Sequence, residues 1–334
     1  MPIAQVPTLK DVAHKAGVSP MTASRALAGN VRVRPDALQR VLSAAAETGY
    51  RRNENARSLR PGQRTGLIGV VVTNLSNPYY AEMLRGVGEV TSALGMRTLV
   101  GESGEEPARQ AELTSDFVGR RADGLVIVPA AGDSGQLAGL ALSNTPVVLA
   151  SRQVEELPFD TVMVDDVVGA CEGTAMLLAE GHRRIAFIGQ ADTVFTSRRR
   201  LEGFALAHER AGVSMATDLI YQGHPDPAAS QLAMRNALAQ ANPATAVFCV
   251  NNRNTLGAVR AVRDAGLPRS GPHGTRIVGF DNFDTVDLLP VHVSIIDHDA
   301  AELGRRAMHL LQERITGGAR GAPRTVLLPT RLLP

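Results

Sequence analysis

Several protein classes depend on residue types that this sequence almost lacks. Of its 334 residues only two are cysteines, Cys171 and Cys249, and neither lies near a cluster of histidines. A disulfide framework and a zinc module are therefore not indicated. Only two residues are lysines, Lys10 and Lys15, both close to the start. Walker A ATPases, pyridoxal-phosphate enzymes and protein kinases are excluded, because each class needs a lysine beyond these positions.

Long apolar runs are also missing. Runs such as 70–72 fall far short of the ~18 residues that a membrane-spanning helix needs. The first residues contain neither the basic nor the apolar segment of a secretion signal. The eight histidines show no metal-ligand spacing such as H-E-x-x-H. We therefore expect no membrane, no metal and no other cofactor, and a reducing, cytoplasmic compartment fits the sequence best.

Length and charge indicate more than one folded unit. The 334 residues suit two or three domains of ~100–200 residues each. Residues 1–64 hold eleven lysines and arginines against four acids, a net charge of +7, whereas the remainder carries −5. This asymmetry suggests a head that binds a polyanion on a body with another task, although a solvated basic surface would carry the same charge.

The start of the chain has the signals of two short helices joined by a tight turn. Thr8 and Asp11 have the spacing of a capping box, so a helix begins there, and Gly17 supplies a left-handed end. Ser19 followed by Pro20 predicts the N-cap and first position of a second helix. This arrangement is a helix-turn-helix, whose second helix can enter the major groove of DNA.

A third helix and a marginal segment follow. Residues 34–36 begin the third helix and Gly49 ends it. Its expected inward side chains are Leu38, Val41, Leu42 and Ala45. Residues 53–60 have the length of one or two helical turns but too few apolar side chains to be stable alone. We interpret them as a linker that folds only on DNA.

From Gly66 onward, short β-branched runs alternate with helix-length segments. This alternation predicts parallel sheets with helices on both faces. The expected strands are residues 67–72, 97–100, 124–128, 184–188, 219–221, 246–250 and 276–279. Because the pattern restarts near residue 184, the predicted fold class is a small all-α helix-turn-helix head plus a two-lobe α/β body.

Polar residues follow several of the expected strands. In open parallel sheets, ligands bind beyond the carboxyl ends of the strands. The polar segments there are residues 73–80, 151–152, 251–253 and 281–282, with Arg200 on a nearby helix. Asp, Asn and Arg side chains offer fixed donors and acceptors to adjacent hydroxyls, and Tyr80 offers a ring face, which is the chemistry of sugar recognition.

Four groups of residues in the head form a specific pattern. They are TLKDVA at 8–13, AGVS at 16–19, TASRAL at 22–27, and Gly49-Tyr50 followed by Asn53 and Ala56. The pattern resembles the head of the lactose/galactose-repressor family of bacterial transcription factors, and the resemblance continues over nearly the full length. It implies a DNA-binding domain at 1–52, a hinge helix and linker at 53–64, and an effector-binding and dimerisation domain with periplasmic-binding-protein-like sheets at 65–334.

The resemblance also implies which head residues contact DNA. They are Thr8, Ser19, Pro20, Met21, Thr22, Ser24, Arg25, Asn53, Ala56, Arg57 and Leu59. Met21 would face base edges, or would only pack within the head. Leu59 would insert into the minor groove as a wedge, or would only anchor the linker against the body.

The effector positions carried over from the family are Tyr80, Arg152, Arg200, Asn251 and Asp281. His298 stands where the family often has glutamine, and it either touches the ligand or caps the helix that follows. Two residues depart from the family pattern: Ser151, where an acid often precedes the arginine, and Asn252, where an aspartate is usual.

These observations favour a cytoplasmic transcriptional repressor and not an enzyme. The resemblance implies a homodimer on a palindromic operator, controlled by a small-molecule effector, for which a sugar or sugar derivative is expected. The effector would change the angle between the lobes, as inducer or as corepressor. The alternative is a sugar-binding or sugar-processing protein with the same body, which would leave the basic head unexplained. The tail after Gly317 has no heptads, so no tetramerising helix is expected.

Overall fold

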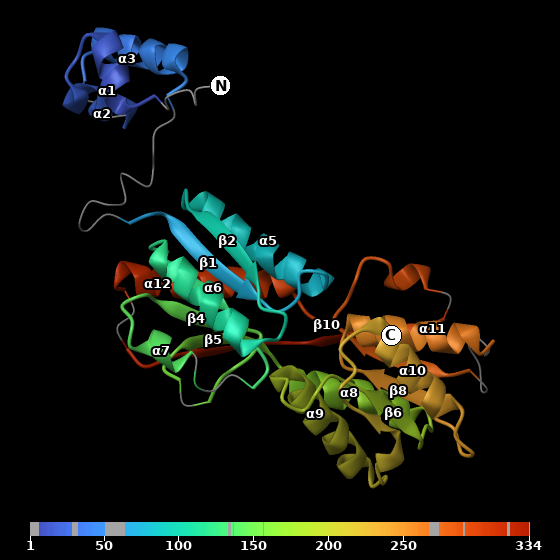
Figure 1. Ribbon diagram of the computed structural model, residues 1–334. Coiled ribbons are helices and arrows are strands. Elements are labelled where there is room, and N and C mark those ends of the chain that lie inside the picture. The colour runs from blue at the N-terminus through green and yellow to red at the C-terminus, as the bar shows by residue number, and fades with distance from the viewer. Residues whose placement is uncertain are drawn as a thin grey trace. The chain divides into compact units, whose positions relative to one another are not determined.

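The computed structural model of the chain describes residues 7–28, 33–50, 64–132, 135, 137–155, 157–266, 274–289, 291–318 and 321–333. The chain divides into two compact units, Met1–Thr65 and Gly66–Pro334. Figure 1 shows the first unit as a group of helices and the second as two sheets with covering helices. This arrangement confirms the predicted fold class.

The first unit contains the predicted helix-turn-helix. Its helices are α1 (Leu9–Ala16), α2 (Pro20–Leu27) and α3 (Pro35–Thr48). Thr8 and Asp11 form the capping box: the Thr8 amide donates to the Asp11 carboxylate at 2.7 Å, and the Asp11 amide donates to the Thr8 hydroxyl at 3.4 Å. Gly17 ends α1 at φ +64°, and the Ser19 hydroxyl caps α2.

Small side chains allow the three helices to pack closely. The buried residues are Val12, Ala13, Ala16, Ala23, Ala26, Val41, Ala44 and Ala45. The prediction that Leu42 faces inward is wrong, because its side chain is 47% exposed. Consecutive helical residues are rotated by about 100° about the axis, so Leu42 turns away from the core when Val41 and Ala45 face it.

The first lobe of the second unit is built on a six-stranded parallel sheet of order β11-β5-β4-β3-β1-β2. The strands are β1 (Leu67–Val72), β2 (Arg97–Glu102), β3 (Gly124–Ile127), β4 (Val147–Ala150), β5 (Asp160–Val164) and β11 (Thr325–Leu328). One face is covered by α5 (Pro78–Ala93) and α12 (Ala300–Thr316), and the other by α6 (Pro107–Gly119) and the short α7 (Ala138–Ala141).

The second lobe repeats this plan with the order β12-β10-β9-β8-β6-β7. Its strands are β6 (Ile185–Ile188), β7 (Ile220–Tyr221), β8 (Ala246–Cys249), β9 (Arg276–Phe280), β10 (Val293–Asp297) and β12 (Arg331–Leu333), of which only β12 pairs antiparallel. One face carries α8 (Asp166–Ala179) and α9 (Phe195–Ala211), and the other α10 (Pro227–Leu238) and α11 (Asn252–Asp264). Short 3₁₀ turns lie at Thr217–Leu219 and Val286–Leu288.

The lobes are joined by short connections. Within the described residues the chain passes between the two sheets three times: from β5 into α8, from β10 into α12, and from β11 into β12. The tail after Gly317 therefore contributes one strand to each sheet. Because each connection is only a few residues long, the second lobe can move relative to the first only by bending at these strands.

Two glycines let α5 and α12 approach to backbone contact. A Cβ atom added at Gly86 would lie 1.9 Å from the carbonyl oxygen of Ala301, and one added at Gly304 would lie 2.0 Å from that of Met83. Any larger side chain at either position would push the helices apart. This crossing fixes α12, which directly follows the connection from β10.

Candidate functional site

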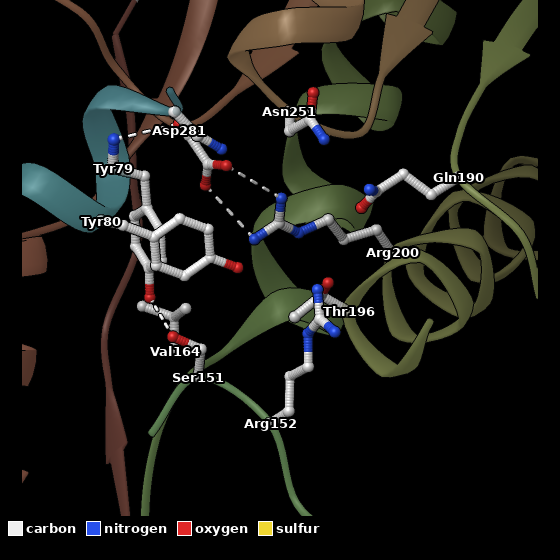
Figure 2. Close-up of a pocket in the computed structure, with 11 residues that line it drawn as sticks. Tyr79, Tyr80, Ser151, Arg152, Val164, Gln190, Thr196, Arg200, Asn251 and Asp281 are labelled. Carbon is white, nitrogen blue, oxygen red and sulfur yellow. Dashed lines mark hydrogen bonds and ion pairs between the residues drawn. The ribbon is translucent and has the colours of Figure 1, made fainter. Parts of the chain in front are cut away.

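A cavity lies between the two lobes, at the carboxyl ends of their strands. It is lined by Asn77, Tyr79, Tyr80, Ser151, Arg152 and Val164 from the first lobe, and by Gln190, Thr196, Arg200, Asn251 and Asp281 from the second. Figure 2 shows these side chains converging from both lobes. Of the residues expected at an effector site, all but His298 line this cavity.

A second cavity adjoins the first and shares part of its lining. Its residues are Thr73, Asn74, Asn77, Tyr80, Glu102, Gly104, Glu105, Arg152, Gln190, Pro225, Asn251 and Arg253. The volumes are about 30 Å³ for the first cavity and about 160 Å³ for the second. Small-molecule pockets usually measure ~300–1,000 Å³, so both cavities are small and the lobes stand close together here.

Two residues at the strand ends hold a left-handed backbone. Ser151, directly after β4, has φ +65°, and Asp281, directly after β9, has φ +66°. Residues other than glycine rarely adopt this conformation, and they do so mostly at functional sites. It turns the backbone sharply just as each strand ends, which brings the Ser151 and Asp281 side chains to the cavity.

Arg200 is the centre of the second lobe's side of the cavity. Its Nε donates to Asp166 Oδ1 at 2.7 Å, and its two terminal nitrogens lie 3.3 and 3.4 Å from the Asp281 carboxylate (Figure 2). The guanidinium also donates to the Val250 carbonyl and stacks on the Phe280 ring, 3.6 Å from its centroid. Arg200 is only 5% exposed. A buried cation is costly unless it is paired, and Asp166 and Asp281 provide that pairing.

The pKa values of the two carboxylates beside Arg200 shift in opposite directions. Burial alone would raise the pKa of Asp281, but Arg200 and His298 outweigh it and lower that pKa. For Asp166, burial outweighs the attraction of Arg200, and the pKa is raised. Asp281 is therefore ionised at neutral pH and able to accept hydrogen bonds from hydroxyl groups.

His298 does not cap the following helix. Its Nε2 donates to Asp281 Oδ1 at 3.0 Å, whereas α12 is capped by Asp299, which accepts from the Glu302 amide at 2.7 Å. The capping alternative is thus contradicted. His298 is absent from the lining of both cavities, so it holds Asp281 by a hydrogen bond from outside them.

Arg152 is held by an acid that the sequence analysis did not identify. Its two terminal nitrogens donate to the two oxygens of Glu105 at 2.7 and 2.6 Å, and one of them also donates to the Pro129 carbonyl at 2.8 Å. Burial would raise the pKa of Glu105, but Arg152 outweighs it and the pKa is lowered. Glu105 comes shortly after β2, so its position beyond a strand end was the signal that could have found it.

Two tyrosines at the start of α5 complete the first lobe's side. The Thr73 hydroxyl donates to the Tyr80 hydroxyl at 2.7 Å, and the Tyr79 hydroxyl is hydrogen-bonded to Ser151. Burial raises the pKa of both phenols, so both remain protonated. Tyr80 was predicted, whereas Tyr79 was not, although it stands next in the chain.

Asn251 and its neighbours lie at the start of α11. Asn251 caps the helix by accepting from the Asn254 amide at 2.9 Å, and its side chain lines both cavities. Asn252, one of the departures from the family pattern, donates to Asn77 of the first lobe at 2.9 Å. Arg253 donates to Ser76 at 3.0 Å. The two lobes therefore touch through polar contacts at the starts of α5 and α11.

The head presents a different kind of surface. Met21, on α2, is 63% exposed, and Arg25 lies exposed one turn further along. Thr8 and Ser19 are exposed and serve as helix caps, Pro20 is exposed, and Thr22 and Ser24 are partly buried. Asn53, Ala56, Arg57 and Leu59 lie outside the described residues.

Neither a metal cluster nor a membrane span is found in the described part of the chain. No group of three or more His, Cys, Asp or Glu side chains is placed to hold a metal ion there. In the same residues, every helix is too short or too polar to cross a bilayer.

Known transcriptional regulators are similar to this chain over nearly its whole length. DegA, a transcriptional regulator of Bacillus subtilis (strain 168), is 29% identical over 98% of this chain and 96% of its own length. CytR, a transcriptional repressor of Escherichia coli (strain K12), is 30% identical over 93% of this chain and 90% of its own length. These relatives are regulators and not enzymes, as expected from the sequence.

Solved structures of regulators are similar to this chain as well. The transcriptional regulator CelR in complex with cellobiose is 28% identical, with a TM-score of 0.73 over 98% of both chains. The lac repressor dimer bound to operator and an anti-inducer is 23% identical, with a TM-score of 0.87 over 99% of this chain and 98% of that one, and supports the fold alone.

The family matches divide at the same place as the fold. Residues 8–53 match the bacterial regulatory proteins of the lacI family, and residues 65–333 match the periplasmic binding proteins and sugar-binding domain of the LacI family. The helix-turn-helix and the two-lobe cleft are thus each matched by the part of the family that carries them, and the chain belongs to the LacI family of bacterial regulatory proteins.

Proposed function

We propose that the protein is a transcriptional repressor that binds a palindromic operator as a homodimer and is controlled by a sugar or sugar derivative in the interlobe cleft. The observation that carries the proposal is the buried Arg200–Asp281 pair, which opens on a cavity lined by both lobes. Fixed donors and acceptors at such a place suit adjacent hydroxyl groups. A ligand held there touches both lobes, so its binding is coupled to their relative orientation.

The effector contacts proposed are Tyr80, Arg152, Arg200, Asn251 and Asp281. Each lines the cavity and combines a polar group with burial, the combination that gives a small-molecule site its specificity. His298 contributes by holding Asp281 rather than by touching the ligand.

The DNA contacts proposed are those of the head. Met21 and Arg25 lie one turn apart on the exposed side of α2, where the Met21 side chain is 63% exposed. Pro20 and Met21 would face base edges in the major groove, and Thr8, Ser19, Thr22 and Ser24 would make further contacts with DNA. Leu59 would insert into the minor groove, Arg57 would hold a phosphate, and Asn53 and Ala56 would contact DNA from the same segment. Two symmetric heads reading a symmetric site is the general logic of this motif.

The domains proposed are a DNA-binding domain at 1–52, a hinge and linker at 53–64, and an effector-binding and dimerisation domain at 65–334. The effector would shift the population of lobe orientations and so change operator affinity in the cytoplasm, a conformational effect without catalysis. The relatives CytR and DegA, which are named as a repressor and a regulator, support this assignment.

Selection of binding sites from a pool of random DNA duplexes tests the proposal. The full chain is expected to enrich a two-fold symmetric sequence, and a sugar that raises the melting temperature of the protein is expected to change its affinity for that sequence. Enrichment of no sequence, or of a single asymmetric site, would contradict the proposed repressor.

A further inference from the structure

The cleft contains arginines that are already neutralised. Arg152 and Arg200 are 4% and 5% exposed. Arg152 holds both oxygens of Glu105, and Arg200 holds Asp166 and Asp281. Neither guanidinium is thus left as a bare cation that could receive a phosphate or carboxylate of a ligand.

The guanidiniums and carboxylates around the two cavities are equal in number. Among the described residues that line the cavities or contact that lining, the guanidiniums are Arg109, Arg152, Arg200 and Arg253, and the carboxylates are Glu102, Glu105, Asp166 and Asp281. Arg253 also donates to Ser76. An anionic ligand would therefore add a charge without a counter-charge.

Two helix N-termini open on the cleft and would by themselves attract an anion. Both are occupied by the chain's own side chains. Asn77 accepts from the Tyr79 amide at 3.0 Å at the start of α5, and Asn251 accepts from the Asn254 amide at 2.9 Å at the start of α11. These caps occupy backbone amides that would otherwise bind an anion, so the attraction for an anion is weaker. The side chains of Asn77 and Asn251 line both cavities.

The groups left for a ligand suit hydroxyls. The contacts from Arg200 to Asp281 are long, at 3.3 and 3.4 Å, so Asp281 can still accept a hydrogen bond from a hydroxyl. Arg152 Nε is buried and has no hydrogen-bond partner among the described residues. The side chains of Gln190 and Asn251 line both cavities and can donate and accept.

We propose that the effector is an uncharged polyhydroxylated molecule, and that Glu105 is the residue that excludes sugar phosphates and sugar acids. Glu105 does so by neutralising Arg152, the one arginine that lines both cavities. This inference rests on the proposed function, because it names the class of ligand for the same cleft.

Matched pairs of ligands test the inference on the wild-type protein. Ribose is compared with ribose 5-phosphate, glucose with glucose 6-phosphate, and galactose with galacturonate, by calorimetry on the full chain at about 0.15 M salt. In any pair of which one member binds, the neutral sugar is expected to bind at least about tenfold more tightly, because both buried arginines are already paired with carboxylates and leave no counter-charge for an anionic group. Tighter binding of the anionic member would overturn the inference and leave the proposed function standing.

Inorganic phosphate gives a second arm that needs no effector. In Glu105→Gln the Arg152 guanidinium loses its counter-charge, so the variant is expected to bind phosphate at least about tenfold more tightly than the wild type. The control is Glu106→Gln, an exposed neighbour with the same change of charge, which is expected to match the wild type. The head is unchanged in all three proteins, so its own affinity for phosphate cancels.

The matched ligands test the class of effector, and phosphate binding by the variants tests the role of Glu105. A gain of phosphate binding in Glu105→Gln with no tested sugar bound would support the role of Glu105 and contradict a sugar as the effector. Equal phosphate binding in all three proteins would overturn the role of Glu105. If Glu105→Gln does not fold, the matched ligand pairs on the wild-type protein decide alone. If no ligand of any pair then binds, both the inference and the assignment of a sugar as effector are overturned.

Discussion

At the scale of single residues, Arg200 ties together parts of the second lobe that are distant in sequence. Its side chain reaches the start of α8 through Asp166, the end of β9 through Phe280 and Asp281, and the end of β8 through the Val250 carbonyl. Removing the guanidinium would leave two buried carboxylates without a cation, which costs several kcal/mol. Its partner Asp281 is therefore the safer position at which to test binding.

Asp281→Asn keeps the shape of the side chain and removes its charge. We expect the effector affinity to fall by about ten- to a hundredfold, since losing a charged hydrogen-bond acceptor costs ~1.5–3 kcal/mol. Operator affinity without effector is expected to be unchanged, because Asp281 belongs to the body. Calorimetry measures the first quantity and anisotropy the second. The matched control is Asp284→Asn, exposed in the same loop; equal effector affinity in both variants would remove Asp281 from the site.

In the head, Met21→Ala is expected to relax the base preference at one position of each operator half-site. The reason is that an exposed apolar side chain at the start of α2 can contact a base edge in the major groove. Lys10→Ala serves as the control: it is expected to weaken binding to all sequences alike and to reduce the salt dependence by about one phosphate. An unchanged base preference in Met21→Ala would show that Met21 only packs.

Contacts between individual side chains were the feature of the site that was hardest to predict from the sequence. Tyr80, Arg152, Asn251 and Asp281 were identified because they follow strands or match the family. Glu105 was not, because it meets Arg152 across 47 positions of sequence and no spacing records that contact. Likewise, His298 could be placed near the site, but its role of holding Asp281 depends on the pairing of β10 with β9.

At the scale of elements, the expected strands correspond to β1, β2, β3, β6, β7, β8 and β9, whereas β4, β5, β10, β11 and β12 were not predicted. The capping box of Thr8 and Asp11 placed α1, and the continuous apolar run of β1 placed that strand within its observed bounds. By contrast, β11 and β12 are short and half exposed. They form because they pair with β5 and β10, which are far away in sequence, so their own residues carry a weak signal.

One cluster of charges fixes the tail to the first lobe. Asp160, at the start of β5, accepts from Arg314 of α12 at 2.6 Å and from Arg324, just before β11, at 2.9 Å. Burial would raise the pKa of Asp160, but the hydrogen bonds from the two arginines outweigh it and lower that pKa to about 2. The ionised carboxylate is therefore stabilised in the folded state.

The pH dependence of stability follows from that lowered pKa. Asp160 stabilises the fold fully above its unfolded pKa, and the contribution disappears as the pH falls through its folded pKa. Asp160→Asn is expected to lower the free energy of unfolding at pH 7 by about 1–2 kcal/mol, allowing for solvent around the arginines. This deficit should shrink below pH ~4.

Urea unfolding of the body at pH 7, 5, 4 and 3 measures the deficit. The control is Asp192→Asn, an exposed acid outside this cluster, and it is expected to show no such deficit. A deficit in Asp160→Asn that stays constant between pH 7 and 3 would show that the ion pairs are not its source.

At the scale of the whole molecule, the proposed regulation requires a body with two lobes whose relative orientation a ligand can bias. The lobes touch through Asn252 and Asn77 and through Arg253 and Ser76, and they are joined by three short connections. A ligand can shift their orientation only by as much as its affinity differs between the two states. A tenfold change in operator affinity requires a coupling of about 1.4 kcal/mol, within reach of one or two hydrogen bonds across the cleft.

The most direct test is an anisotropy titration of labelled operator DNA with the full chain, with and without a saturating sugar that calorimetry shows to bind. We expect the sugar to change operator affinity by at least about tenfold in the wild type. We also expect the same sugar concentration to have little effect on Asp281→Asn, whose affinity without sugar equals that of the wild type. Identical operator affinity of the wild type with and without bound sugar would contradict the proposed regulation.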